Sequence, residues 1–506
     1  MESPRTPIIT LPDGQLIGTR DDDIAVWRGI PYAAPPTGDR RWRAPQPVIP
    51  WEGVRVADRF GAAAWQDAQT CRDIAGGDPG TFDEDCLWLN VWAPAEVSAD
   101  AALPVMVWLH GGSFTLGSGG LAPYDGRALA RRGAVVVTVN YRLGLLGFFA
   151  HPALQGEDIS GETWNFGLLD QIAALYWVRK NIARFGGDPR NVTLFGESAG
   201  GRSVLSLLAS PLGRGLFDKA IVQSAYTLED ESAEKAQARC MAAVRHLGAG
   251  IDSDAATLRK LPADALCAAG MPFTMGPVPI CGDRVLPQSM MRCFMAARQH
   301  PVPVMIGSNS DEASVMNFFG IDLAQQIQRM RRERRLGLGL IRMLYPGVRN
   351  DAELGRQVCR DMAFTTMGYI VMQACRRRKV ACWRYWFDYV AAGERERYPH
   401  GAWHGNEIPY VFDNLALTPP VNDCAEASDR VFAGQVADYW TAFARWRPGQ
   451  ATILDGPLRW PASGPGHDGV LRIGVRRCAG FKLERRFMRA RARLFRRVMR
   501  HHVSLD

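Results

Sequence analysis

A serine stands between two glycines in the stretch GESAG (196–200), directly after the apolar run 191–195. A G-x-S-x-G pattern between a strand and a helix is typical of a nucleophilic serine at a sharp backbone turn. Glycines on both sides remove the clash that side chains would make with neighbouring backbone. The following helix would offer free N–H groups to developing negative charge. Ser198 is therefore the candidate nucleophile. A plain helix N-cap is the alternative, but it does not explain both glycines.

A serine hydroxyl needs a base that takes its proton and donors that stabilise the oxyanion it creates. The stretch HGGSF (110–114) follows a predicted strand, and its glycines would let backbone N–H groups point at a bound carbonyl oxygen. Together with the N–H of Ala199, these groups would form a hole with three donors. An ordinary glycine turn is the alternative interpretation of 110–114.

These residues need a scaffold, and the hydrophobic pattern predicts one. Apolar runs predict strands, and apolar residues at helical spacing predict helices. The strands are expected at 103–110, 133–142, 191–195, 219–225 and 302–309, and the helices at 168–182 and 198–210. This alternation indicates a mostly parallel sheet covered by helices on both faces. Sites in such sheets lie beyond the carboxyl ends of the strands, where Gly112, Ser198 and Asn309 are expected.

The composition is that of an ordinary globular chain, with 506 residues of which 47% are apolar and 22% charged. The net charge of +8 comes largely from arginine-rich runs at 329–335, 376–379 and 476–500. No nucleic-acid-binding motif accompanies them, so solvated surface arginine is favoured over an anionic partner. No linker marks a boundary. A single domain over 1–506 is predicted, with a basic helical tail at 476–506.

The cellular setting can be predicted only coarsely. The first residues lack the apolar core of a signal peptide, and no run of about 18 apolar residues occurs. A cytoplasmic chain without a transmembrane segment is expected, with a secreted chain that has lost its leader as the alternative. The eleven cysteines show no metal-ligand spacing. Cys71 and Cys86 could close a short loop, although a reducing compartment would keep them as thiols.

Several stretches together resemble the type-B carboxylesterases, the family of the cholinesterases and the bacterial para-nitrobenzyl esterases. They are WRGIPYAAPPTGDRRWRAPQP (27–47), EDCLWLNVWAP (84–94), WLHGGSF (108–114), NYRLGLLGFF (140–149), FGGDPRNVTLFGESAGG (185–201), GSNSDEAS (307–314) and HGNEIPYVF (404–412). The resemblance covers about residues 8–450. It implies the α/β-hydrolase fold, with a central, mostly parallel sheet, flanking helices and long insertions. It also implies a triad in the chain order Ser, acid, His.

The resemblance implies roles for individual residues of the triad. His404 lies where the family has its base, whereas His400, four positions earlier, lies outside the matching block. From the residues alone, either Asp311 or Glu312 could orient an imidazole. The family uses glutamate at the second of these positions, which implies Glu312 as the acid and a structural role for Asp311. No metal or organic cofactor is expected.

The family match implies the backbone N–H groups of Gly112, Ser113 and Ala199 as oxyanion donors. Ser113 stands where the family often has glycine, and its side chain would narrow that side of the pocket. Cholinesterases carry a choline-stacking tryptophan in a long disulfide loop. The interval 71–86 is short and contains no tryptophan, so choline esters are not favoured substrates.

Three further features have alternative interpretations. Glu197 would tune water or His404 beside the nucleophile, or would complement the helix dipole. The sequon NVT (191–193) lies in the strand that leads to Ser198 and is expected to be buried and unmodified. The basic stretch 481–503 would lie on a membrane surface or, as favoured, dock on the body as a terminal helix.

The sequence therefore predicts a serine hydrolase that cleaves small-molecule carboxylic esters through an acyl-enzyme intermediate. An amidase, a carbamate hydrolase or a lactonase would use the same triad. A non-catalytic binding protein on this fold is the alternative from another class. The pocket walls are expected from 225–300 and 315–400, which contain no readable motif. The natural ester and the oligomeric state are not predicted.

Overall fold

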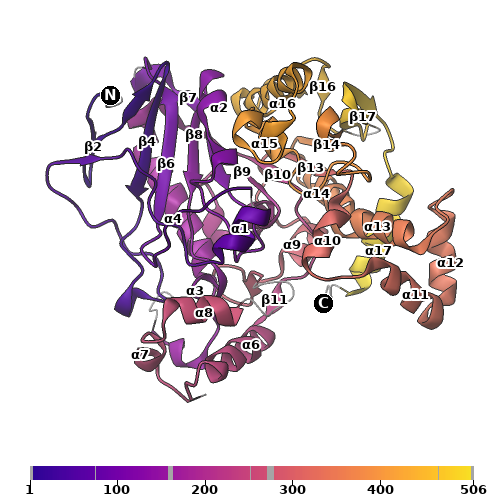
Figure 1. Ribbon diagram of the computed structural model, residues 1–506, viewed down its shortest axis with the longest axis horizontal. Coiled ribbons are helices and arrows are strands. Elements are labelled where there is room, and N and C mark those ends of the chain that lie inside the picture. Colours follow the sequence, from indigo (N-terminus) through magenta and orange to yellow (C-terminus); the bar gives the residue numbers. More distant parts are fainter. Residues whose placement is uncertain are drawn as a thin grey trace.

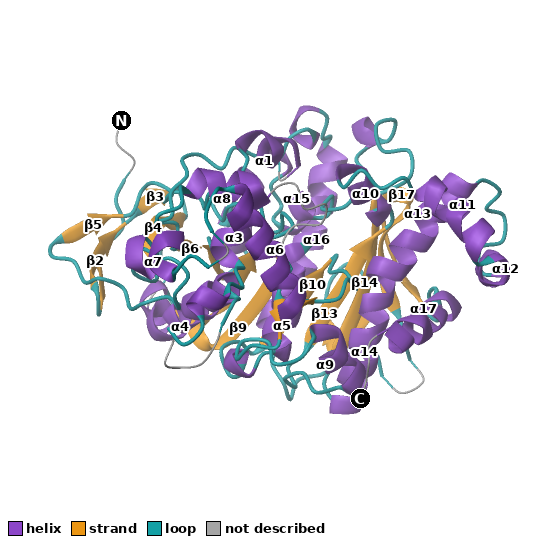
Figure 2. Ribbon diagram, turned by 90° about the horizontal axis from the view of Figure 1, so that it is seen from below, coloured by secondary structure: helices purple, strands orange, loops and turns teal. Residues whose placement is uncertain are grey.

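A large, mostly parallel sheet forms the centre of the molecule (Figures 1 and 2). In this computed structural model the described residues are 4–74, 76–97, 99–157, 163–250, 252–270, 278–464 and 467–502. Within them, ten strands form the sheet. Across it they are β17 (Val470–Glu484), β14 (Cys382–Tyr389), β13 (Val304–Asn309), β10 (Lys219–Gln223), β9 (Gly187–Glu197), β7 (Leu103–Leu109), β8 (Val135–Val139), β6 (Trp88–Pro94), β4 (Ile24–Pro31) and β3 (Thr19–Asp21). Neighbours from β17 to β8 are parallel, and the remaining pairs are antiparallel.

All five predicted strands belong to this sheet, as β7, β8, β9, β10 and β13. Each has buried apolar residues at its centre, as expected for strands that are covered on both faces. The strand before the serine is longer than predicted, because β9 begins at Gly187, before the apolar run 191–195. The predicted helices are also present, as α4 (Phe166–Asn181) and α5 (Ala199–Ala209).

Alternate residues of the central strands enter two separate hydrophobic cores. In β7, Val105 and Val107 contribute to the first core, whereas Met106 and Trp108 contribute to the second. Successive side chains of a strand point to opposite faces, so one strand serves both cores. The first core is covered by α4, α5, α9 (Met290–Ala296) and α14 (Thr366–Arg378), and the second by α2 (Arg127–Arg131), α15 (Ile408–Val411) and α16 (Ala427–Arg445).

Two groups of helices extend away from the sheet. In Figure 1 the first group lies below it and the second lies at the right. The first contains α6 (Ala233–His246), α7 (Ala255–Leu258) and α8 (Ala263–Gly270), which pack in a small core of their own with α3 (Gly144–Gly147). The second contains α11 (Leu323–Glu333), α12 (Arg335–Met343) and α13 (Asp351–Arg360), which pack against the C-terminal α17 (Arg489–His502). α10 (Val315–Phe318) joins the second group to the sheet.

The remaining elements are short. They are α1 (Ala68–Ile74), a three-stranded sheet of β1 (Ile9–Leu11), β2 (Gly14–Ile17) and β5 (Val54–Val56), and the two-stranded pairs β11 (Glu231–Ser232) with β12 (Ile280–Cys281) and β15 (Ile453–Leu454) with β16 (Trp460–Pro461). None of the described helices is long and apolar enough to cross a membrane.

The prediction of a helical tail over 476–506 is wrong for its first part. β17 continues to Glu484, and helix begins only at Arg489. Pairing with β14 and the packing of Phe481 against the rings of Phe432 and Tyr439 override the helical spacing of the apolar residues. The later part does dock as a terminal helix, because Phe495 is buried among α11–α13. Residues 503–506 lie outside the described part of the chain.

Two smaller predictions concern side chains that the fold buries. The Cys71 and Cys86 thiols are both buried and unbonded. Burial raises the pKa of the Cys71 thiol to about 11, so it is an unreactive thiol at neutral pH. The sequon residue Asn191 is buried, and its Oδ1 accepts a hydrogen bond from Nζ of Lys219 at 2.5 Å. Its side-chain amide is therefore enclosed in the folded protein, as expected.

Candidate active site

Ser198 occupies a sharp turn between β9 and α5. Its φ and ψ are 54° and −117°, a conformation that residues with a side chain rarely adopt and that is typical of functional sites. A β-carbon at Gly200 would lie 2.0 Å from the carbonyl oxygen of Leu109, and one at Gly196 would lie 2.7 Å from the same atom. Both flanking glycines are therefore required because β7 passes close to the turn.

His404 lies in the loop between β14 and α15 and reaches the serine across 206 positions of sequence. The hydroxyl oxygen of Ser198 is 2.8 Å from Nε2 of the imidazole. This distance is typical of a hydrogen bond from an O–H donor to a nitrogen acceptor. The backbone N–H of His404 donates to Oγ of Ser314 at 2.9 Å, which holds the loop. The ring of Phe364 packs beside the imidazole, with centroids 5.2 Å apart.

Glu312 is the carboxylate that faces His404. Its Oε2 lies 2.5 Å from Nδ1 of the imidazole, and its Oε1 accepts the backbone N–H of Asn309 at 2.6 Å. Asp311 instead forms an ion pair with Arg356. Burial raises the pKa of Asp311 to about 6, although Arg356 opposes this. Because β13 ends at Asn309, the short turn that follows aims only the second carboxylate at the histidine.

His400, the other histidine close in sequence, does not approach Ser198 in this way. Its Nδ1 lies 3.6 Å from a carboxylate oxygen of Glu353, and half of its side chain is exposed. The structure therefore brings together Ser198, Glu312 and His404, and it separates Asp311 and His400 from them.

Glu197 also lies against the imidazole. Its Oε1 is 3.3 Å from Nε2 of His404, on the same side as the serine hydroxyl. Burial raises the pKa of Glu197 to about 8, and the neighbouring histidine only partly opposes this. Burial by itself would lower the pKa of His404, but the carboxylates of Glu197 and Glu312 outweigh it and raise that pKa. This contact agrees with the interpretation in which Glu197 tunes His404.

Glu407 is a buried residue of the site that sequence reasoning missed. Its carboxylate accepts hydrogen bonds from the side-chain amides of Asn309, at 2.5 Å, and Gln223, at 3.1 Å. Burial raises the pKa of Glu407, and the nearby charge of Glu312 raises it further. The contacts tie the ends of β10 and β13 together below the histidine. The only signal in the sequence was its place in the block HGNEIPYVF (404–412).

The glycine turn after β7 lies directly beside Ser198. A β-carbon at Gly111 would come within 3.2 Å of Cβ of Ser198. Gly112 and Ser113 have φ values of 100° and 54°, so the turn is left-handed at both positions. Within the described residues, the N–H groups of Gly112, Ser113 and Ala199 donate no hydrogen bond to a loop or a side chain. They remain available for a ligand oxygen.

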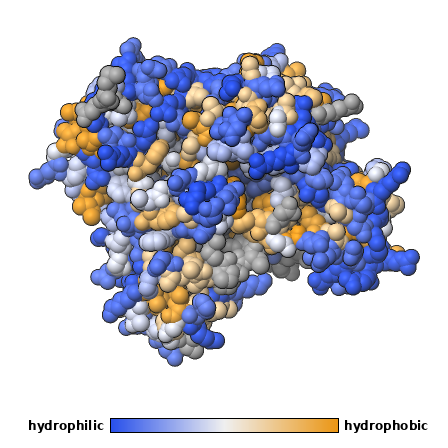
Figure 3. All heavy atoms as spheres, in the orientation of Figure 1, coloured by the Kyte–Doolittle hydropathy of each residue, from blue (hydrophilic) through white to orange (hydrophobic). Residues whose placement is uncertain are grey.

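A hydrophobic cavity of about 430 Å³ opens over Ser198 and His404. Apolar residues predominate in its wall, with Ser113, Ser198 and His404 at the reacting end. The other lining residues are Tyr226, Thr227, Leu228, Glu229, Met291, Val315, Met316, Phe319, Met362, Ala363, Phe364, Val498 and Met499. Figure 3 shows hydrophobic atoms near the middle of the face where Figure 1 places α9 and α10. The expected regions 225–300 and 315–400 do contribute, but the wall formed by α17 was not predicted.

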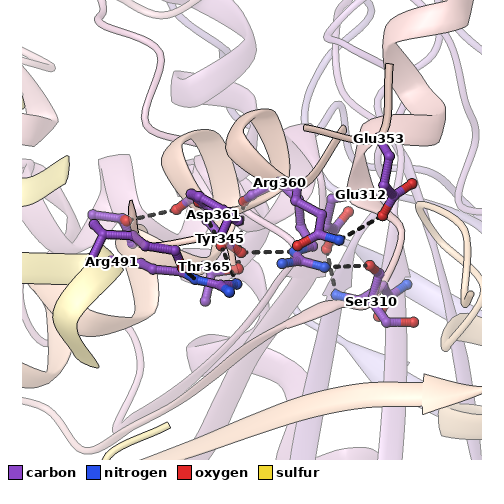
Figure 4. Close-up of polar contacts among 12 residues, drawn as sticks. Ser310, Glu312, Tyr345, Glu353, Arg360, Asp361, Thr365 and Arg491 are labelled. Carbon is purple, nitrogen blue, oxygen red and sulfur yellow. Dashed lines mark hydrogen bonds and ion pairs between the residues drawn. The ribbon is translucent and has the colours of Figure 1, made fainter. Parts of the chain in front are cut away.

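The buried side chain of Asp361 holds together the cavity wall on the side of α13 and α17 (Figure 4). Asp361 accepts hydrogen bonds from the hydroxyl of Tyr345 at 2.8 Å, from Nε of Arg360 at 2.7 Å and from NH1 of Arg491 at 3.1 Å. It also begins a π-helical turn, 361–365, which presents Phe364 to the cavity. π-helical turns inside helices are frequent at functional sites.

Comparisons with known proteins agree with this architecture. The model of the carboxylesterase family matches residues 5–492. A fumonisin B1 esterase of Sphingopyxis macrogoltabida is 37% identical over 467 residues, which cover 84% of this chain and 79% of the relative. A para-nitrobenzyl esterase of Bacillus subtilis (strain 168) is 35% identical over 457 residues, which cover 87% of this chain and 89% of the relative.

A solved structure of a PNB esterase has a TM-score of 0.80 at 30% identity and covers 96% of this chain and 99% of its own. The prediction of an α/β-hydrolase fold, with a mostly parallel sheet and flanking helices, is thereby confirmed. The family match spans nearly all of the sequence, and the two relatives are named as esterases. The chain therefore belongs to the type-B carboxylesterase family and is a carboxylesterase.

Proposed function

We propose that this carboxylesterase cleaves its substrate through an acyl-enzyme formed on Ser198. His404 takes the hydroxyl proton, and Oγ attacks the carbonyl carbon of the ester. Glu312 holds the imidazole by its Nδ1–H and stabilises the imidazolium that forms. The observation that carries the proposal is the 2.8 Å contact between the Ser198 hydroxyl and Nε2, with Glu312 on the opposite nitrogen.

The tetrahedral intermediate places a negative charge on the former carbonyl oxygen. The backbone N–H groups of Gly112, Ser113 and Ala199 are the proposed donors to this oxyanion. Support comes from the closeness of the glycine turn to Ser198 at Gly111 and from the lack of a loop or side-chain partner for these three N–H groups within the described residues. Ala199 is also the first residue of α5, whose dipole favours negative charge at its N-terminus.

The intermediate collapses when His404 returns the proton to the departing alcohol. The acyl group then remains on Oγ of Ser198 as an ester. His404 next removes a proton from a water molecule, which attacks the acyl carbonyl and releases the carboxylic acid. The same oxyanion donors serve both halves of the reaction.

The favoured substrates are neutral esters with hydrophobic groups of variable shape. The cavity wall is largely apolar, and four of its residues are methionines, whose flexible side chains adapt to different shapes. Among the described lining residues there is a carboxylate, Glu229, and no lysine or arginine. An anionic substrate would therefore enter without a cationic partner and would face Glu229.

Substitution of the nucleophile tests the mechanism. Ser198→Ala is expected to lower kcat for a para-nitrophenyl ester by about 10⁴- to 10⁶-fold, because the triad acts as a unit. Labelling of Ser198 by a fluorophosphonate probe distinguishes the enzyme from a non-catalytic binding protein. Near-wild-type hydrolysis by a folded Ser198→Ala variant would rule out the mechanism.

An ester panel tests the proposed substrate class separately. Values of kcat/KM are expected to rise with acyl length until the cavity is full, and to drop for acyl groups that end in a carboxylate. Glu229→Gln should reduce the discrimination against the anionic esters and leave the neutral ones nearly unchanged. The matching anilides, included in the same panel, measure amidase activity. A preference for anionic esters would contradict the assignment.

A further inference from the structure

α12 presents hydrophobic side chains to solvent. Leu336, Leu340 and Met343 are 88%, 58% and 70% exposed. They follow one another at spacings of four and three residues, which places them on one side of the helix. We call these three residues the α12 stripe. Single exposed apolar residues are ordinary, but three in a row on one helix face are characteristic of a contact surface.

The α12 stripe is not the side of the helix that packs in the core. The opposite side of α12 is already packed, because Leu338 is buried with Ile327, Leu354 and Phe495 of the neighbouring helices. Ile341 also packs against this cluster. The inner side fixes the orientation of the helix, so the stripe is held outward in the folded protein.

The segment of sequence that contains the α12 stripe is strongly basic. Residues 329–349 contain seven arginines and one glutamate. Part of this positive charge is offset, since Arg331 and Arg342 both pair with the single carboxylate of Asp351. The run at 332, 334 and 335 is different. All three arginines there are exposed, and no ion pair joins them to another described residue.

The stripe lies at one end of the molecule. Figure 1 shows α12 at the extreme right, at the end of the long axis opposite β2. The space-filling view in Figure 3 shows a largely hydrophilic surface over this end, interrupted by hydrophobic atoms at its edge. A broad flat partner can therefore approach α12 without meeting the rest of the body.

We propose that the α12 stripe and Arg332, Arg334 and Arg335 bind an anionic lipid surface. The apolar side chains enter the boundary between headgroups and acyl chains, and the guanidinium groups bind the lipid phosphates. Charge complementarity favours lipid over a second copy of the chain. A symmetric contact between two copies would bring the same uncompensated arginines together. This binding is independent of the proposed catalytic mechanism.

Vesicle sedimentation of the full chain tests the proposal. The wild type should bind vesicles that contain phosphatidylglycerol, bind phosphatidylcholine vesicles weakly, and be released by added salt. The triple variant L336S/L340S/M343S should bind at least about tenfold more weakly, because it removes the inserted apolar groups. The variant R332Q/R334Q/R335Q should lose about a hundredfold on anionic vesicles, at roughly fivefold for each arginine.

Matched variants control for composition. I8S/I49S/V431S removes three other exposed apolar side chains, and R59Q/R190Q/R459Q removes three other exposed arginines. Both controls should bind vesicles like the wild type. Hydrolysis of a short para-nitrophenyl ester should be unchanged in all four variants, which shows that each is folded.

Several results would overturn the proposal. The wild type could fail to bind anionic vesicles, or the control variants could lose as much binding as the test variants. A third such result would come from light scattering. The wild type would be a dimer that does not bind vesicles, and the substitutions L336S/L340S/M343S would convert it to a monomer. That outcome would assign the α12 stripe to an interface between copies of this chain.

Discussion

At the scale of single residues, the site depends on which charges face the imidazole of His404. Glu312 lies at Nδ1 and Glu197 at Nε2, so the histidine stands between two buried carboxylates. Both favour the protonated imidazole and raise its pKa, whereas the proposed mechanism begins from the neutral imidazole. Activity should therefore rise with pH as His404 loses its proton. The pH at which this acid limb of the pH–rate profile occurs depends on the charges beside the imidazole.

The charge of Glu197 can be removed with little change in shape. In Glu197→Gln the anion beside Nε2 is absent, so the pKa of His404 falls. The acid limb of the kcat/KM profile should then move to lower pH by about one unit. The matched control is Glu229→Gln at the cavity wall, for which the limb should stay in place. A limb that moved upward in Glu197→Gln would contradict the electrostatic account.

The two adjacent carboxylates after β13 can be separated by parallel substitutions. Glu312→Gln should lower kcat by about 10³- to 10⁴-fold, because the imidazole loses the group that orients it. Asp311→Asn should instead lower Tm and keep most of kcat, because it breaks the partly buried ion pair with Arg356. Measurements of kcat and Tm on both variants check this. The reverse pattern would assign the acid to Asp311.

At the scale of elements, the turn at Ser198 was the part most open to prediction. It is specified by a local pattern, an apolar strand followed by glycines at fixed positions. In the structure, a β-carbon at either glycine would lie too close to the backbone of β7. β17 was not predicted from the sequence, because its arginines interrupt the apolar pattern of a strand. It forms a strand because it pairs with β14. The α17 wall of the cavity depends on contacts between segments far apart in the chain, which no local pattern encodes.

The turn offers a steric prediction with a matched control. Gly200→Ala places a β-carbon 2.0 Å from the carbonyl oxygen of Leu109, so either the strand or the turn must move. We expect the variant to lose about 3 kcal/mol or more of unfolding free energy, with nearly complete loss of esterase activity. Gly339→Ala in α12 has no neighbour within 4 Å and should be neutral or slightly stabilising. Urea unfolding compares the two.

At the scale of the whole molecule, Asp361 connects parts that are distant in sequence. Through Tyr345, Arg360 and Arg491 it joins the end of α12, the π-helical turn and the C-terminal helix. α17 in turn supplies Val498 and Met499 to the cavity. Docking of the C-terminal helix therefore completes the cavity wall, and this arrangement could not be predicted from the order of the residues. We expect substrate selection to depend on it.

Loss of this anchor should alter selectivity more than chemistry. In Asp361→Asn the two arginines lose their anionic partner, so α17 is held less firmly and Tm falls. KM should rise more for long acyl esters than for acetate, while kcat for acetate changes little. The control is Glu333→Gln, which removes an exposed ion pair with Arg329 and should leave Tm and both KM values nearly unchanged. Equal effects on long and short esters would contradict the coupling.

The central claim is that Ser198 carries the acyl group during turnover. Rapid acid quenching of the enzyme during hydrolysis of a para-nitrophenyl ester, followed by peptide mass spectrometry, tests it most directly. The account predicts an added acyl mass on the peptide that contains Ser198, and its absence in Ser198→Ala. An acyl group on another residue, or rapid hydrolysis by the Ser198→Ala variant, would contradict the account.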